Sequence, residues 1–144
     1  MSVTQISAKD AFSLLTSEDN VLLIDVRTYE ETHFVGFVDP AAIDEKLVLL
    51  PWRLFPEMKI NQQFGTAINE ILPKFFGEDC KENTKLIFIC RSGGRSDQAA
   101  FEATTLGYKN CYNVISGFEG DIDANNHRGN VNGWKAENLP WRQS

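Results

Sequence analysis

A seven-residue polar stretch between an apolar run and a helical pattern constrains the fold of this chain more than any other feature. The stretch begins at Cys90, directly after the continuous apolar run 86–89. Such a run predicts a strand that is buried on both faces, as in a parallel sheet. A helical spacing of apolar residues follows over 98–106 and ends near Gly107. The sequence therefore predicts a strand, a tight loop and a helix, with a cysteine at the carboxyl end of the strand.

This arrangement is typical of an anion-binding site. Backbone N–H groups of a tight loop converge on one point, and the N-terminus of the following helix adds partial positive charge. Gly93 and Gly94 allow the backbone angles that such a loop needs. Arg91 and Arg95 add two formal charges. Because this field favours the nucleophilic thiolate, we expect Cys90 to be reactive rather than a structural cysteine.

The rest of the chain predicts an α/β fold. Apolar runs at 21–24 and 47–50 indicate further strands, 110–115 is expected to be the last strand, and 3–6 a short edge strand. Helical patterns follow the capping residues Ser7 and Asn61. This alternation predicts a mostly parallel central sheet flanked by helices on both faces. The length of 144 residues fits one domain that spans 1–144.

Several segments lack a regular pattern. We expect 28–39 to be irregular, 51–58 to be a loop with two exposed aromatic residues, Trp52 and Phe55, and 77–83 to be a polar turn with Cys80 exposed. The segment around Trp134 and 139–141 is expected to dock the C-terminus onto the domain.

Composition narrows the class of protein. The net charge of −6 gives no electrostatic basis for binding nucleic acid or an anionic membrane. The 3 cysteines have no paired spacing, which argues against a disulfide framework or a zinc site and favours a cytoplasmic protein. No run is long enough to span a bilayer. The acidic loop that begins at Asp121 lacks the glycine and glutamate of a calcium loop, so we expect it to bind no metal. We also expect no cofactor.

Three features resemble the rhodanese family of sulfurtransferases. The segment 23–27, followed by Glu30, Glu31, His33 and Gly36, resembles the first signature of that family. The loop 90–96 closely resembles its active-site loop, and 112–117 with the later tryptophan segment resembles its closing strand and tail. The resemblance implies a rhodanese-like fold and a thiosulfate sulfurtransferase-like activity.

The resemblance also implies a reaction that a single cysteine carries. The Cys90 thiolate would take the outer sulfur of a small anionic donor such as thiosulfate and form a persulfide. Cyanide, a thiol or a protein acceptor would then remove that sulfur. The residues expected to bind the substrate are those of the loop, namely Arg91, Ser92, Gly93, Gly94, Arg95 and Ser96.

Charged residues in the loop and near it are expected to support the site. Asp25 and Arg27 follow a strand, so they should lie at the same sheet edge as Cys90 and orient the connecting loop. Arg95 is expected to brace the loop against Asp25 or one of the two glutamates, because its rigid fork suits that task. Arg91 at the loop mouth would guide the anion.

Two departures from the family pattern concern the substrate. The segment after Arg27 is shorter than usual and lacks a glycine before His33. Residues 119–132 look like an insertion, in which His127 and Arg128 are candidate anion contacts unless the loop is simply solvated.

Two other functions compete with sulfur transfer. A cysteine phosphatase or arsenate reductase uses a similar loop with one residue more between its cysteine and arginine. Here only four residues separate Cys90 from Arg95. A non-catalytic rhodanese-like interaction module is the third option, but such modules commonly lack the cysteine that this chain keeps.

Overall fold

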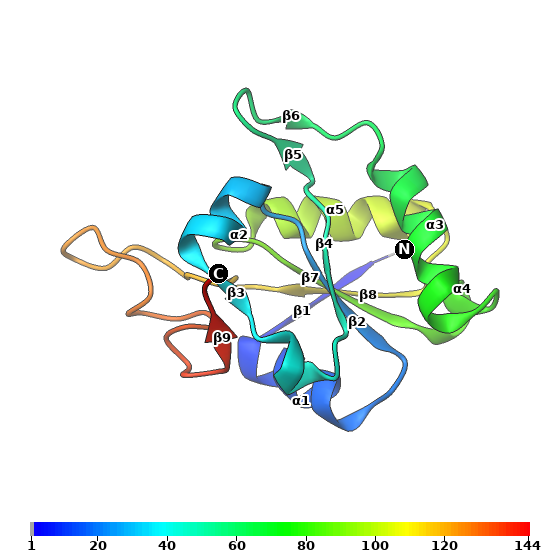
Figure 1. The fold of residues 1–144 in the computed structure, drawn as a ribbon, viewed down its shortest axis with the longest axis horizontal. Helices are drawn as coiled ribbons and strands as arrows, with labels where there is room; N and C mark the ends of the chain where they lie inside the picture. The colour runs from blue at the N-terminus through cyan, green and yellow to red at the C-terminus, as the bar shows by residue number, and fades with distance from the viewer. Residues whose placement is uncertain (1) are drawn as a thin grey trace.

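The computed structural model describes residues 2–144 and has a five-stranded parallel β-sheet at its centre (Figure 1). The strands lie in the order β1-β8-β7-β2-β4, and all neighbours pair in parallel. Their bounds are Val3–Ile6 for β1, Val21–Asp25 for β2, Leu47–Leu49 for β4, Lys85–Ile89 for β7 and Asn110–Val114 for β8. The predicted mostly parallel α/β architecture is confirmed.

Two hydrophobic cores cover the two faces of this sheet. Side chains alternate along a strand, so Leu22 and Ile24 face one core while Val21 and Leu23 face the other. Burial on both faces explains why the strands are continuous apolar runs. The helices of the first core are α3 (Phe64–Phe76), α4 (Cys80–Asn83) and α5 (Gly94–Thr105); those of the second are α1 (Ala8–Ser17) and the 3₁₀-helix η1 (Pro40–Ile43). In Figure 1, α1 and α5 lie on opposite sides of the strands.

Two short antiparallel pairs complete the fold. Strands β5 (Arg53–Leu54) and β6 (Lys59–Ile60) form a hairpin that projects beyond the main sheet in Figure 1. Strand β9 (Trp141–Arg142) pairs with β3 (Phe37–Val38). The Trp134 indole is fully buried and donates from Nε1 to the Pro140 carbonyl oxygen at 2.8 Å. The predicted docking of the C-terminal segment is therefore confirmed.

The structure corrects several local expectations. Residues 28–39 are not irregular, because they contain helix α2 (Tyr29–Val35). Cys80 is 3% exposed rather than a surface residue, since α4 packs its side chain into the first core. Trp52 is also buried there, in edge contact with Phe64, while Phe55 is exposed as expected. Helix α3 begins at Phe64, and the Asn61 side chain accepts a bond from the Gln63 N–H in the turn before it.

Within residues 2–144, no helix has the length and apolar character needed to cross a membrane. The same residues contain no cluster of three or more histidine, cysteine or acidic side chains with metal-site geometry. The expectation of one domain over 1–144 stays a prediction.

Candidate active site

The cysteine loop lies at the carboxyl end of the central strand β7 and leads directly into α5. Gly93 is the residue before the helix, with φ of 109°. A Cβ there would lie 2.2 Å from the Ile115 carbonyl oxygen, so both its backbone angle and its surroundings require glycine. Its N–H donates to Cys90 Sγ at 3.1 Å. The cysteine is only 1% exposed, so a small group must enter the loop to reach its sulfur.

Ser96 places a hydroxyl beside the same sulfur. It is fully buried in the first turn of α5, and its Oγ lies 3.2 Å from Cys90 Sγ and 3.2 Å from the Gly93 carbonyl oxygen. It also lies within hydrogen-bond distance of Asn113 Oδ1 on β8. A hydroxyl has one proton, so these three acceptors compete for it. The sulfur environment therefore depends on Asn113 as well as on Ser96.

Asn113 connects the loop to the edge of the sheet. Its Nδ2 donates to the Gly93 carbonyl oxygen at 3.2 Å and to Gln5 Oε1 on β1 at 2.8 Å. Gln5 in turn donates from Nε2 to Asp97 of α5 at 2.7 Å. Because a carboxylate only accepts, Asp97 fixes the orientation of both amides and directs Asn113 Oδ1 toward Ser96. This role of Asn113 and Gln5 was not predicted from the sequence, where the available signal was the polar Asn113 between Tyr112 and Val114.

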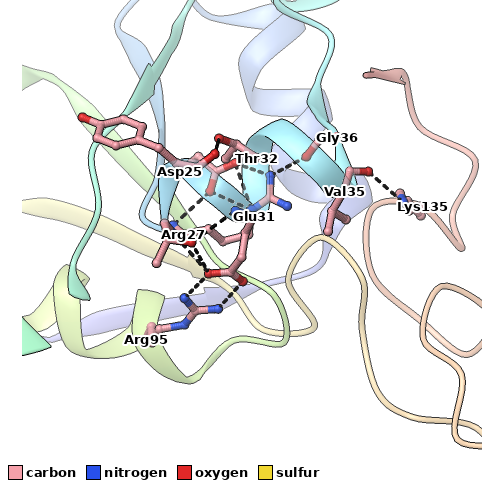
Figure 2. Close-up of polar contacts among 10 residues, drawn as sticks. Asp25, Arg27, Glu31, Thr32, Val35, Gly36, Arg95 and Lys135 are labelled. Atoms are coloured by element: carbon pink, nitrogen blue, oxygen red, sulfur yellow. Dashed lines mark hydrogen bonds and ion pairs between the residues drawn. The ribbon is translucent and has the colours of Figure 1, made fainter. Parts of the chain in front are cut away.

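Asp25 and Arg27 form a buried ion pair next to the loop (Figure 2). Arg27 donates from Nε to Asp25 Oδ1 at 2.9 Å and from Nη2 to Oδ2 at 2.6 Å. Nη2 also donates to the Gly36 carbonyl oxygen at 2.8 Å, and the guanidinium stacks 4.4 Å from the Phe118 ring centroid. The pair thus ties the end of β2 to the end of α2, and its orienting role in the site stays a prediction.

Arg95 is held by α2 rather than left free. Its Nη1 and Nη2 donate to the two carboxylate oxygens of Glu31 at 2.6 and 2.8 Å, as Figure 2 shows. A capping box places Glu31, since its side chain accepts from the Thr28 N–H while Thr28 accepts from the Glu31 N–H. Arg91, by contrast, is exposed and has no ion-pair partner within 4.0 Å in residues 2–144. Of the two loop arginines, only Arg91 is available to an incoming anion.

The ionisation of Glu31 responds to this pairing. Burial alone would raise the pKa of its carboxyl, but hydrogen bonds and charge from Arg95, with bonds from Thr28, lower the pKa from 4.5 to about 2. The pKa of Arg95 is raised, chiefly by its hydrogen bond to Glu31. Both groups are therefore charged across the neutral range, and the loop remains braced.

The Glu31–Arg95 pair predicts a pH-dependent stability. Between pH 4.5 and about 2 the unfolded carboxyl binds more protons than the folded one, so the free energy of unfolding falls as pH falls. We expect Glu31→Gln to lower that free energy by about 3 kcal/mol near pH 6, and the deficit to shrink toward pH 2. Urea unfolding of the wild type and of Glu31→Gln between pH 6 and pH 2 measures this deficit. A deficit that does not change with pH would contradict the prediction.

Within residues 2–144, neither candidate anion contact of the insertion forms a hydrogen bond with the cysteine loop. Arg128 donates to the Gly120 carbonyl oxygen at 2.7 Å within its own segment. The His127 N–H donates to Asp123, which organises that turn. The base of the insertion does support the site, because the N–H groups of Glu119 and Gly120 both donate to the Arg91 carbonyl oxygen.

Comparisons with known proteins agree with this fold. Residues 7–124 match the sequence model of the family described as Rhodanese-like domain, so the chain belongs to the rhodanese-like family. The uncharacterized protein RC0915 of Rickettsia conorii is 39% identical over 142 residues, with 99% of each chain covered. The crystal structure of Rv0390 from M. tuberculosis is 35% identical, covers 100% of both chains and has a TM-score of 0.86. A polysulfide-sulfur transferase homodimer from Wolinella succinogenes shares the fold at 21% identity and TM-score 0.61, over 99% of this chain and 80% of the other.

Proposed function

We propose that this protein is a sulfurtransferase that carries sulfane sulfur on Cys90. The observation that supports this best is the geometry at the sulfur. A buried thiol accepts the Gly93 N–H, lies beside the Ser96 hydroxyl and is followed by a helix N-terminus. This is a compact set of donors suited to holding a negatively charged sulfur atom.

In the first half of the proposed reaction, the Cys90 thiolate attacks the outer sulfur of a donor such as thiosulfate. A sulfur–sulfur bond forms to Sγ, the bond inside thiosulfate breaks, and sulfite leaves with the electron pair. In the second half, cyanide or a thiolate attacks the terminal persulfide sulfur and the Cys90 thiolate leaves. The loop N–H groups and the helix N-terminus stabilise the anionic persulfide between these steps.

The contacts of Arg95 favour this reaction over phosphate chemistry. A phosphate site needs an arginine fork that is open to the anion. Both terminal nitrogens of Arg95 already bind Glu31, and the loop has four residues between Cys90 and Arg95. Arg91, which is exposed, is therefore proposed as the residue that guides the donor, while Arg95 holds the loop in shape.

Intact mass spectrometry tests the proposed function directly. The protein is incubated with thiosulfate, desalted and measured, and is then treated with cyanide and measured again. We expect the mass of one sulfur atom to be added on Cys90 and removed by cyanide. Absence of any adduct, combined with turnover of an aryl phosphate, would overturn the proposal in favour of a phosphatase; absence of both would favour a binding module.

We expect the Asn113 side chain to contribute both to stability and to the rate of sulfur loading. Asn113→Ala removes the donor to the Gly93 carbonyl and the acceptor for Ser96. We expect the free energy of unfolding to fall by about 2 kcal/mol and sulfur loading from thiosulfate to slow by about tenfold, since the loop is less well positioned. Asn110→Ala is the matched control, because the Asn110 side chain lies at the other end of the same strand and donates to the Glu82 carbonyl oxygen. Equal loading rates for the two variants would contradict the prediction.

A further inference from the structure

A pocket of about 450 Å³ lies next to the cysteine loop. Arg91 and Arg95 form its side nearest the cysteine. Helix α2 forms a second side, and the segment that joins β5 to β6 forms a third. The pocket therefore borders the cysteine loop, where a sulfur donor of the proposed reaction would enter.

The outer walls of this pocket are apolar. Phe34 on α2 is 74% exposed, and Phe55 in the hairpin is 59% exposed. Met58 also lines the pocket and is partly exposed. Neither aromatic side chain belongs to a hydrophobic core. Two large apolar surfaces facing one pocket beside a reactive site indicate a ligand with an apolar body.

The charges of the pocket point to the same kind of ligand. Its lining contains two arginines and two glutamates, Glu30 and Glu31, so the formal charges cancel. The whole chain carries a net charge of −6, so the protein offers no excess positive field for a dianion. Within the pocket only Arg91 is a cation without an ion-pair partner in residues 2–144. One available cation beside an apolar wall complements a ligand with a single negative charge and an apolar body.

We propose that the preferred sulfur donor is a monoanionic organic sulfane compound, with an aromatic or branched alkyl body that packs against Phe34, Phe55 and Met58. This inference rests on the proposed function of Cys90. For a thiosulfonate donor, the Cys90 thiolate attacks the outer sulfur and forms a persulfide. The bond between the outer sulfur and the sulfonyl sulfur breaks, and its electron pair leaves with the sulfinate.

Two thiosulfonates of equal charge test the proposal. The rate of sulfur loading on Cys90 is measured with benzenethiosulfonate and with methanethiosulfonate, and the ratio of the two kcat/KM values is compared between variants, so that intrinsic reactivity cancels. In the wild-type protein we expect the ratio to exceed that of a free small-molecule thiol by about tenfold, as partial burial of a phenyl ring allows. Phe55→Ala should lower that ratio by at least about threefold.

Phe75→Ala is the matched control, because Phe75 is 46% exposed on α3 and does not line the pocket. Its ratio should equal that of the wild type. A wild-type ratio equal to that of the free thiol, or equal ratios in the Phe55 and Phe75 variants, would overturn this inference while loading from thiosulfate still supported the proposed function. No loading from any of the three donors would overturn both.

Discussion

Cys90→Ser is expected to take up no sulfur from thiosulfate while keeping its fold. A serine hydroxyl is not ionised near neutral pH and cannot replace the thiolate as the nucleophile. The hydroxyl is close in size to the thiol and can accept the same Gly93 N–H bond, so packing around the loop is largely preserved. Intact mass after thiosulfate should show no adduct, and circular dichroism should show an unchanged melting profile to within a few degrees.

Cys111→Ala is the control for this experiment. Cys111 is also buried, but burial raises the pKa of its thiol to about 12, so it is a poor nucleophile. Its alanine variant should load sulfur at the wild-type rate. Sulfur loading in the Cys90 variant, or loss of loading in the Cys111 variant, would contradict the assignment of the persulfide to Cys90.

Asp25→Ala is expected to destabilise the fold by about 3 to 5 kcal/mol, because it leaves a buried guanidinium without its counter-charge. Within residues 2–144, Nη1 of Arg27 already has no hydrogen-bond partner, so the side chain has no spare contact with which to compensate. Only the Gly36 carbonyl would still accept from it. Urea unfolding at neutral pH measures the loss.

A surface ion pair provides the comparison. Glu18→Ala removes the partner of Lys85 in a pair whose side chains are 42% and 30% exposed, and should cost less than about 1 kcal/mol. Adding Arg27→Met to Asp25→Ala should recover part of the stability, since the unpaired buried charge is then gone. A loss for Asp25→Ala as small as that for Glu18→Ala would show that the buried pair contributes little.

The sequence was sufficient for the sheet and the loop because both have strong local patterns. Strands buried on two faces appear as continuous apolar runs, and the cysteine loop is a contiguous segment. Helix α2 was missed because the residues 29–33 are mostly polar and lack helical periodicity; its available signal was the Thr28–Glu31 capping box. The prediction that Cys80 is exposed was wrong because its sequence neighbours are mostly polar, although its own side chain packs into the core.

Contacts between distant segments could not be read from the sequence. The partners of Asn113 come from three different elements, and Gln5 is 108 residues away along the chain. The pocket likewise combines α2 with a hairpin that no periodicity indicated. Such features depend on how strands are ordered in the sheet, and that order is a property of the whole chain.

The pairing of β1 with β8 has a consequence for how the protein is made. The first strand of this sheet to be synthesised is held in place by the last strand of the same sheet, and non-local pairings of this kind form late. Gln5 and Asn113 therefore meet only after the chain has been synthesised as far as β8. A nascent chain in which Cys90 has been synthesised but β8 has not still lacks the contacts of Asn113 with Ser96 and Gly93. We therefore expect the thiol to acquire its full environment only after β8 has joined the sheet.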